Sequence, residues 1–485
     1  MLQVLRRIIF NTHSLSKSLI LCPTLFIIDF MLRTKIIATF GPAISEPSVL
    51  TEALKIADII RFNFSHGTPE EKLQAKELVE KTAKKLNRNI SLLADLPGPK
   101  IRVSKLENDI YIKTGQEIVF VHHPNAKGDE IPIELDIYDD MKVGCEISIG
   151  DGNPKLIITK LKDRRIFCKS LQDGKIGSRK GINVKGINMS ASPPTSDDLK
   201  LIEFVKKHGF DYIALSFVKS AEDVKKARKI SGNMLVISKI ERQEAINDIE
   251  NIVAVSDGVM IARGDMALNI EFNEVPLVQD KIINACRKNG KPVIVATQML
   301  ESMTRNQSPT RAEMTDIANA VKSGTDCIML SDETAVGKFP IDALKAMSSI
   351  ASYTETMMSN DSNTNVSIKN THEGIAAAAA GISRTCKTDA IFIITKTGST
   401  AKLLSSLRPE SSIIAVSDSE ELFRSFGIFY GLRGVDIPIS TNEEVIKKIK
   451  EYAKKLSILS YIIVFGHTEK SGTSDTILCF WEKNN

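Results

Sequence analysis

Short, nearly continuous apolar runs recur between residues 31 and 357, and helical spacing of polar and apolar positions follows each of them. TKIIAT (34–39) is rich in β-branched residues and ends at a polar residue, which is typical of a parallel strand buried on both faces. PEEKLQAKELVEKTAKKL (69–86) has the pattern of an amphipathic helix. The predicted strands are 34–39, 58–63, 90–95, 211–216, 235–239, 258–263, 292–297 and 326–331.

Eight strands alternating with helices predict an α/β fold built on a (β/α)8 TIM barrel, with a doubly wound sheet as the alternative. The intervals between successive strand ends are 22, 34, 120, 24, 24, 34 and 33 residues, so one interval is an outlier. Removing residues 101–186 reduces it to 120 − 86 = 34. Residues 34–357 then contain 324 − 86 = 238 residues, close to the ~250 of a typical barrel. The even spacing favours closure.

The segments outside this barrel predict two further domains and a distinct extension. Residues 101–186 are β-rich and punctuated by glycine, which predicts an inserted all-β lid. After a polar linker, strand-like runs at 390–395, 412–417, 435–439, 461–466 and 476–481 predict a C-terminal α/β regulatory domain. The expected domains are an extension over 1–30, a catalytic barrel over 31–100 and 187–357, the lid over 101–186 and the C-terminal domain over 358–485.

Residues 1–30 differ in character from the rest of the chain. Their only charges are Arg6, Arg7, Lys17 and Asp29, and the apolar stretch 18–28 is too short to span a bilayer. Three interpretations stay open: translation that begins at Met31, an organelle transit peptide, or a poor secretory signal. We expect a cytoplasmic protein, or an organellar one if the extension is a real transit peptide.

Composition narrows the class of protein. The chain has 485 residues, of which 42% are hydrophobic and 25% charged, so it is neither disordered nor collagen-like. A net charge of +5 is too small to indicate nucleic acid, and no segment indicates a membrane partner. Seven scattered cysteines without a C-x-x-C pair exclude a disulfide scaffold or zinc site and favour a reducing compartment.

The active site of a barrel lies at the carboxyl ends of its strands, and polar residues gather at those positions in this sequence. The alternative is that these charged residues form a ring of salt bridges that only closes the barrel. The residues at the strand ends are Thr39, Arg61, Asn63, Ser65, Asp95, Ser216, Lys239, Glu241, Arg263, Asp265, Thr297, Gln298 and Ser331.

Local spacing points to phosphoryl transfer. Lys239 and Glu241 are two apart and therefore lie on one face of an extended strand. A carboxylate to hold a divalent cation and an ammonium to neutralise charge suit a transferring phosphoryl group. In ARGD the chain turns at Gly264, so Asp265 can add a second oxygen ligand for Mg²⁺ or Mn²⁺. Free N–H groups at this turn can bind a carboxylate.

RFNFSHG, DLPGPKIR, SKIE, ARGD, ATQMLESM and SPTRAEMTDIANAV resemble the motifs of the pyruvate kinase family, in order and over residues 31–481. The resemblance implies transfer of the phosphoryl group of phosphoenolpyruvate to ADP in glycolysis. It implies that Lys239 and Arg61 stabilise the phosphoryl group and that Glu241 and Asp265 bind Mg²⁺. It also implies that Thr297 lies near the route of enolate protonation. Substrate contacts are implied for Arg61, Phe217, Ala262, Arg263, Gly264, Asp265 and Thr297, and nucleotide contacts for Pro42, His66, Arg102 and Lys180.

One departure from the family pattern bears on the monovalent cation. Many members hold K⁺ with an Asn, a Ser, an Asp and a Thr, and this chain keeps Asn63, Ser65 and Asp95 but has Leu96 in place of Thr. Lys100 replaces a Glu, and its ammonium can take the place of the cation, as in the K⁺-independent branch. We therefore expect activity without added K⁺; the alternative is that Lys100 faces solvent.

In the C-terminal domain, TKTGSTA (395–401) joins a strand to a helix, and its hydroxyls and N–H groups suit a phosphate. In the family this region binds a sugar-phosphate effector, and AMP is a further candidate; an ordinary helix cap is the alternative. The candidate effector residues are Thr395, Thr397, Ser399 and Thr400, with Ser471, Gly472 and Thr473 as a second wall and Lys396 and Arg433 as partners. The resemblance also implies a homotetramer.

Two other functions stay open at this point. A metal-dependent aldolase or carboxylase that uses phosphoenolpyruvate would need a similar barrel but not Arg102 and Lys180 on a lid, so dependence on nucleotide separates it from a kinase. A catalytically inactive effector-binding protein is disfavoured by the intact Arg61, Lys239 and Glu241.

Overall fold

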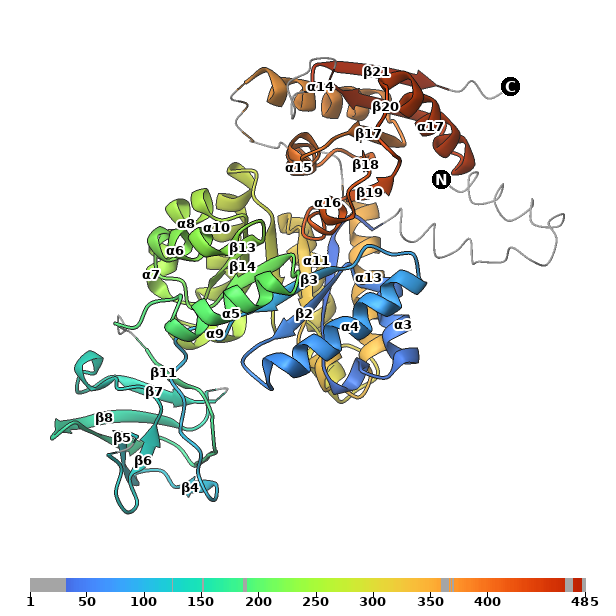
Figure 1. Ribbon diagram of the computed structural model, residues 1–485. Helices are drawn as coiled ribbons and strands as arrows, with labels where there is room; N and C mark the ends of the chain where they lie inside the picture. Colours follow the sequence, from blue (N-terminus) through green and yellow to red (C-terminus); the bar gives the residue numbers. More distant parts are fainter. Residues whose placement is uncertain are drawn as a thin grey trace.

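The computed structural model describes residues 32–481 except 124, 151, 186–189, 359–365, 367, 369 and 467–473. Figure 1 shows three parts: a central barrel ringed by helices, a separate β-rich insert on one side, and a C-terminal α/β domain on the other. The extension 1–30 and the predicted second wall of the effector site (Ser471, Gly472 and Thr473) lie outside the described residues.

The eight predicted strands form one closed barrel in the order β1-β16-β15-β14-β13-β12-β3-β2, with all neighbours parallel. This confirms the barrel and excludes the doubly wound sheet. The strands are β1 (Lys35–Thr39), β2 (Ile59–Asn63), β3 (Ser91–Asp95), β12 (Tyr212–Leu215), β13 (Leu235–Ile240), β14 (Gly258–Ala262), β15 (Val293–Ala296) and β16 (Cys327–Leu330).

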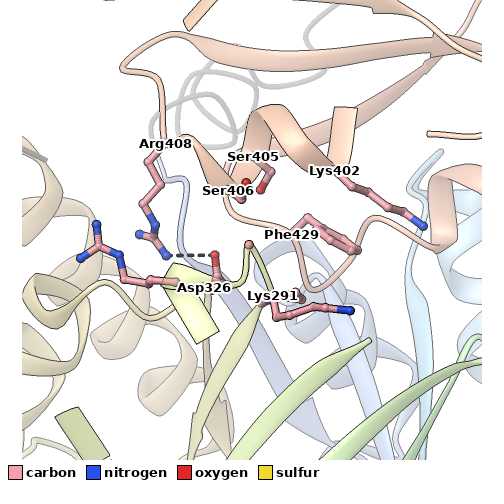
Figure 2. A pocket seen from close by; sticks show the side chains of 10 residues that line it. Lys291, Asp326, Lys402, Ser405, Ser406, Arg408 and Phe429 are labelled. Atoms are coloured by element: carbon pink, nitrogen blue, oxygen red, sulfur yellow. Dashed lines mark hydrogen bonds and ion pairs between the residues drawn. The ribbon is translucent and has the colours of Figure 1, made fainter. Parts of the chain in front are cut away.

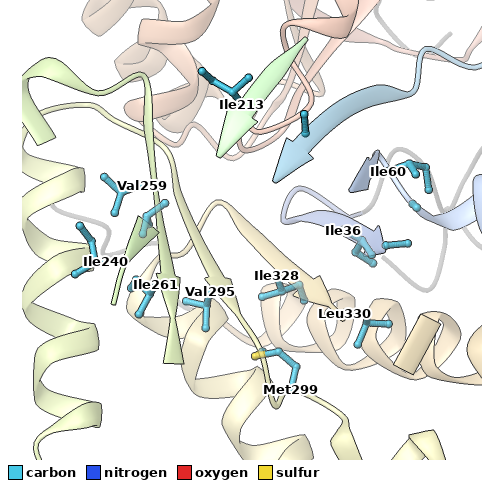
Figure 3. Close-up of a cluster of buried hydrophobic side chains, with 14 of the residues drawn as sticks. Ile36, Ile60, Ile213, Ile240, Val259, Ile261, Val295, Met299, Ile328 and Leu330 are labelled. Carbon is cyan, nitrogen blue, oxygen red and sulfur yellow. The ribbon is translucent and has the colours of Figure 1, made fainter. Parts of the chain in front are cut away.

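The strands read as continuous apolar runs because both of their faces are buried. Alternate residues point outward into the layer beneath the helices, where Figure 3 shows Ile36, Ile60 and Val295 among the packed side chains. The intervening residues, such as Ile37 and Met260, fill the barrel interior. That inner cluster continues without a break into the C-terminal domain.

Helices cover the barrel, and their ends carry recognisable start and stop signals. In α4, Thr68 and Glu71 form a capping box, Pro69 occupies the first turn, and Lys84 and Lys85 lie in the last turn beside the negative end of the helix dipole. The barrel helices are α3 (Pro47–Ile56), α4 (Pro69–Lys85), α5 (Ser196–Lys207), α6 (Ala221–Ser231), α7 (Gln243–Asn247), α8 (Ile249–Val255), α9 (Arg263–Asn269), α10 (Val275–Lys288), α11 (Arg311–Ser323), α12 (Asp332–Ala335) and α13 (Pro340–Met357).

The insert after β3 is all-β, as predicted, and has its own hydrophobic core. A six-stranded sheet has the order β11-β7-β8-β9-β5-β6, and β4 pairs with β10. Where the chain enters and leaves the insert, Arg102 and Gly181 form an antiparallel bridge. The strands are β4 (Ile110–Ile112), β5 (Glu117–His122), β6 (Ile131–Ile133), β7 (Glu146–Ile149), β8 (Lys155–Lys162), β9 (Arg165–Ser170), β10 (Gly174–Ile176) and β11 (Ile182–Val184).

The C-terminal domain is a five-stranded sheet in the order β19-β18-β17-β20-β21, parallel except for β21. The strand expected at 435–439 lies instead at Leu432–Asp436, before Pro438, which has no N–H for a sheet hydrogen bond. The elements are α14 (Thr371–Cys386), β17 (Ala390–Ile394), α15 (Ser399–Ser406), β18 (Ser412–Ser417), α16 (Glu420–Arg424), β19, α17 (Asn442–Lys455), β20 (Ser460–Phe465) and β21 (Thr476–Trp481).

The C-terminal domain packs on the amino-terminal end of the barrel, here called the base. A side chain at Gly427 would overlap the Ser91 side chain of β3, so the backbone at Gly427 lies directly against that side chain. A small pocket lies at the same junction, between α15 and the barrel loops (Figure 2). Beside it, Arg408 donates to Asp326 Oδ1 at 2.9 Å. Among the described helices, none is both long and apolar enough to cross a membrane.

Candidate active site

The carboxyl ends of the barrel strands, here called the mouth, hold a buried network of charged side chains. Arg61 Nε donates to Asp95 Oδ2 at 2.7 Å, and Lys239 Nζ lies 3.2 Å from Asp95 Oδ1 and 3.0 Å from Glu241 Oε1. The Asp95 and Glu241 side chains are 2% and 0% exposed. Strand pairing creates this closeness, since Asn63 on β2 is level with Asp95 on β3.

Burial and neighbouring charges shift the pKa values of this network in different directions. Burial pushes the pKa of Asp95 up, but Lys239 and Arg61 outweigh it, and the pKa lies below its ordinary value. Burial lowers the pKa of Lys239, yet Asp95 and Glu241 raise it well above its ordinary value. Burial, partly offset by Lys239, raises the pKa of Glu241. Lys239 is therefore a fixed positive charge at neutral pH.

Two hydroxyl groups tie the network to the barrel. Ser216 Oγ accepts from Lys239 Nζ at 2.7 Å and donates to the Leu96 carbonyl at 2.7 Å. Thr39 Oγ1 accepts from Arg61 Nη1 at 3.0 Å and donates to the Leu330 carbonyl at 2.8 Å. Both residues stand at predicted strand ends, but the sequence gives no signal of these orienting contacts.

The structure gives Lys100 a different neighbour from the one expected. Its ammonium donates to Asp265 Oδ1 at 2.8 Å and lies 5.7 Å from the centre of the Phe217 ring, while its stem packs against Gly181 at the edge of the insert. Asp95 instead receives Arg61 and Lys239. The expectation that the Lys100 ammonium takes the place of the monovalent cation stays a prediction.

Of the other two predicted ligands of the monovalent cation, Asn63 ends β2 and Ser65 lies just after it. Ser65 N–H donates to Asn63 Oδ1 at 3.0 Å, and Phe64 N–H donates to the Asp95 carbonyl at 2.9 Å. These bonds hold the three predicted ligands Asn63, Ser65 and Asp95 at neighbouring strand ends.

Strained backbone concentrates at the mouth. Phe217, Thr297 and Gln298 have φ angles of +58°, +69° and +55°, a region that costs non-glycine residues free energy, most of all a β-branched threonine. Two of them make contacts with other residues of the site. Phe217 N–H donates to Glu241 Oε2 at 2.6 Å, and Thr297 Oγ1 accepts from Gly264 N–H at 2.8 Å. The fold keeps these conformations because they aim groups at the mouth.

Arg263 does not direct its guanidinium to the mouth, in contrast to the expected substrate contact. Nη1 donates to both carboxylate oxygens of Asp316, at 2.8 and 2.7 Å, and Nη2 donates to the Thr297 carbonyl at 2.8 Å. Ala262 ends β14 and is buried. Of the ARGD segment, Gly264 and Asp265 are the residues that take part in the contacts described at the mouth.

The residues expected to contact nucleotide lie on the insert side of the mouth. Arg102 Nη1 donates to the Arg179 carbonyl at 3.1 Å, and the Lys180 carbonyl accepts from Val103 N–H at 2.9 Å, so both stand on the chains that join barrel and insert. Partial burial and then the charges of Arg102 and Lys72 lower the pKa of His66. Pro42 begins a short 3-10 helix (Pro42–Ile44) after β1.

The donor set fits a hard divalent cation that completes its shell with substrate and water. Glu241 Oε1 is buried and, apart from its ion pair with Lys239, has no hydrogen-bond partner. The Asp265 carboxylate is close enough to raise the pKa of Glu241 further, after the larger effect of burial. Within the described residues no group of three or more His, Cys, Asp or Glu side chains could form an all-protein cage. Two carboxylates with open positions are what Mg²⁺ or Mn²⁺ at a phosphate prefers.

The predicted effector loop lies between β17 and α15, as expected. Gly398, in the left-handed conformation, is the N-cap, and its N–H donates to Thr395 Oγ1 at 2.9 Å. The remaining hydroxyls pair locally, Thr397 with Ser399 and Thr400 with Ser474, each at 3.0 Å. Arg433 instead faces the barrel base, 3.8 Å from Asp58, which corrects its expected pairing with this loop.

Family comparison agrees with this arrangement along the chain. Residues 31–344 match the barrel domain of pyruvate kinase, and residues 373–479 match its alpha/beta domain. The chain is 36% identical over 417 residues to a pyruvate kinase of Thermococcus litoralis, covering 82% of this chain and 88% of the relative. It is 39% identical over 426 residues to that of Staphylococcus aureus, covering 84% and 72%. A crystal structure of a pyruvate kinase from Cryptosporidium parvum superposes with a TM-score of 0.86 at 32% identity, covering 92% of this chain and 96% of that one.

Proposed function

Because this chain belongs to the pyruvate kinase family, we propose that it transfers the phosphoryl group of phosphoenolpyruvate to ADP, giving pyruvate and ATP in the last step of glycolysis. The observation that carries the proposal is the buried Arg61–Asp95–Lys239–Glu241 network. It presents two fixed cations beside a buried carboxylate, one oxygen of which has no hydrogen-bond partner apart from its ion pair with Lys239. Charge spread over phosphoryl and enolate oxygens is stabilised by preorganised cations of this kind.

The proposed roles follow from position and charge. Lys239 and Arg61 face the transferring phosphoryl group, and Glu241 and Asp265 hold Mg²⁺ or Mn²⁺. When bound, the metal ion neutralises negative charge on substrate oxygens. The substrate carboxylate lies at Gly264 and Thr297, with Phe217 on the pocket wall. Arg102 and Lys180 contact the nucleotide phosphates, and Pro42 and His66 its adenosine side.

The reaction breaks the bond between phosphorus and the enol oxygen and forms one between phosphorus and a terminal oxygen of ADP. The enolate left behind accepts a proton at its methylene carbon and becomes pyruvate. Lys239 is an unsuitable proton donor, because Asp95 and Glu241 outweigh burial and raise its pKa well above the ordinary value. Its role is therefore to stabilise charge, and the proton reaches the enolate along a route near Thr297.

A coupled assay that follows pyruvate tests the function directly. Pyruvate is expected from phosphoenolpyruvate only when both ADP and Mg²⁺ are present, and ATP should form in equal amount. Pyruvate without ADP would indicate hydrolysis of phosphoenolpyruvate, and consumption of phosphoenolpyruvate without pyruvate would indicate a carboxylase or aldolase, which joins the enol carbon to a second substrate. Absence of any turnover with all components present would contradict the proposal.

For the monovalent cation, the proposal is activity without added K⁺. Asp95 is already paired with two cations, Leu96 lacks the side-chain oxygen of the family threonine, and Lys100 adds a fixed charge beside Asp265. The assay compares rates with and without K⁺ in a tetramethylammonium buffer, for the wild type and Lys100→Met. The exposed Lys105→Met is the matched control. Wild-type rates should hardly change, and Lys100→Met alone should lose activity. A large K⁺ activation of the wild type would contradict this.

Regulation and assembly are proposed on family resemblance. Thr395, Thr397, Ser399 and Thr400 line an effector loop for a sugar phosphate or AMP, and the enzyme is a cytoplasmic homotetramer with the domain limits given above. A shift of the phosphoenolpyruvate saturation curve on addition of either ligand, lost in Thr397→Ala, supports the loop. An unchanged saturation curve would contradict the proposed effector loop. Sedimentation of a monomer at micromolar concentration would contradict the tetramer.

A further inference from the structure

The Arg263 guanidinium uses all three of its nitrogens on the protein. Besides the bidentate pair with Asp316, Nη2 reaches the carbonyls of Thr297 and Gln298 at 2.8 and 3.3 Å and the Met299 sulfur at 2.8 Å. Nε lies 3.3 Å from the Thr297 carbonyl. Arg263 is 8% exposed, so water does not compete for these donors. With its donors engaged in this way, the side chain has no free edge to offer a substrate.

What Arg263 grips is the strained turn at the end of β15. Thr297 and Gln298 are consecutive residues in the left-handed region, which costs on the order of 1–3 kcal/mol for each. Such a pair persists only where surrounding contacts outweigh the cost. Three hydrogen bonds from one fixed, planar cation to this turn are contacts of that kind.

The next residue of the same segment holds the other side of Thr297. Gly264 N–H donates to Thr297 Oγ1 at 2.8 Å, and that hydroxyl lies 2.6 Å from the Ala296 carbonyl. Arg263 fixes the Thr297 carbonyl and Gly264 its hydroxyl, so the start of α9 sets both the backbone and the side chain of Thr297. A change of φ at Thr297 would move its hydroxyl away from Gly264.

We propose that Arg263 is a positioning residue that holds the Thr297 turn in its strained conformation beside the substrate, and that Asp316 on α11 sets the orientation of its guanidinium. The proposal rests on the proposed function, in which Thr297 holds the phosphoenolpyruvate carboxylate. It also accounts for the motif SPTRAEMTDIANAV, whose Asp316 lies behind the mouth yet is joined through one side chain to ARGD and ATQM.

The test compares Arg263→Lys and Asp316→Asn with Glu313→Gln as the matched control. Glu313 also lies on α11 and anchors the same loop, but at Ser302, whose N–H and hydroxyl it accepts at 2.8 and 2.6 Å. A lysine keeps the charge of Arg263 but cannot form the fork. Arg263→Lys should lower kcat/KM for phosphoenolpyruvate by about 100-fold and Asp316→Asn by about 10-fold, the scale of a small misplacement. KM for ADP should stay unchanged in both.

Glu313→Gln should lose thermal stability and leave both KM values as they are in the wild type. Equal losses in all three variants, or losses in kcat with unchanged KM for phosphoenolpyruvate, would overturn the proposal in favour of a purely structural role.

Hydrogen–deuterium exchange of peptides covering 262–266 and 296–299 needs no catalysis and separates this proposal from the proposed function. Faster exchange of both segments in Arg263→Lys, but not in Glu313→Gln, supports the positioning role of Arg263 at the Thr297 turn even if the wild type proves to have another activity. Unchanged exchange in Arg263→Lys overturns it.

Discussion

At the base of the barrel aspartates are satisfied by backbone amides, whereas at the mouth carboxylates face cations and one another. Asp58, Asp211, Asp257 and Asp326 each precede a strand, and each Oδ2 accepts an N–H of an adjacent strand at 2.8–3.0 Å. Their donors are Ile36, Leu92, Val236 and Val293. The same residue type therefore serves the same purpose at four places around the base.

The positively charged partners of these carboxylates also differ between the base and the mouth. At the base, Arg408, Arg424 and Arg433 come from the C-terminal domain and pair with Asp326, Asp211 and Asp58, which fastens that domain to the barrel. At the mouth, Lys239 and Arg61 share Asp95, and Glu241 keeps an oxygen without a hydrogen bond. The closely packed charges of the mouth and the backbone-bonded aspartates of the base indicate that mouth charges serve chemistry and base charges serve stability.

The largest expected effect is that of Glu241→Gln at the mouth. The amide has the shape of the carboxylate but not its charge, so Mg²⁺ binding should weaken and kcat should fall by about 10³-fold or more. The melting temperature should stay close to that of the wild type, because Lys239 keeps its ion pair with Asp95. Steady-state rates over a Mg²⁺ titration and a thermal melt measure both. A rate within tenfold of the wild type would show that Glu241 has a structural role, like the charged residues at the base.

At the base, Arg408→Met should show the opposite behaviour. The variant leaves Asp326 buried without its cation and removes donors to the Gly324 and Thr325 carbonyls. Stability should fall by about 3–5 kcal/mol, as for other broken buried pairs. Urea unfolding measures the loss, and kcat per folded molecule should match the wild type. A large fall in kcat with unchanged stability would show that the Arg408–Asp326 pair serves catalysis rather than stability.

A third test uses pH. Burial, partly offset by Arg424, raises the pKa of Asp211 from 3.8 to about 6. A carboxyl that binds its proton more tightly when folded makes the free energy of unfolding fall as pH rises from about 4 to about 6, and level off above. The fall should amount to roughly 3 kcal/mol. Urea unfolding at several pH values should show this slope in the wild type relative to Asp211→Asn. Parallel curves for the two proteins would contradict it.

The smallest effect is expected for Asp257→Asn. Its partner Arg228 is 43% exposed, and an asparagine still accepts the Val236 N–H. The cost should be about 1 kcal/mol or less in urea unfolding, with turnover unchanged. A loss as large as that of Arg408→Met would show that the solvent exposure of an ion pair at the barrel base does not determine its contribution to stability.

The sequence predicted the barrel, its insert and the closeness of Lys239 and Glu241, because strand periodicity determines which face a residue occupies. It could not predict the directions of side chains at strand ends. Arg263 was expected to contact substrate and Lys100 to take the place of a monovalent cation; in the structure Arg263 pairs with Asp316 and Lys100 with Asp265. The strained φ of Thr297 and the pairing of Asp316 depend on contacts between distant segments, for which a single sequence contains no periodic signal.

Replacing Lys239 with Met is the sharpest test of whether the charged network at the mouth is catalytic. The methionine fits the space but removes the fixed cation that Asp95 and Glu241 hold at the mouth. Single-turnover measurement of pyruvate formation should show a loss of about 10³-fold or more, with phosphoenolpyruvate still bound at nearly wild-type affinity and an unchanged far-ultraviolet dichroism spectrum. Turnover near the wild-type rate would contradict the assignment of the mouth network to catalysis.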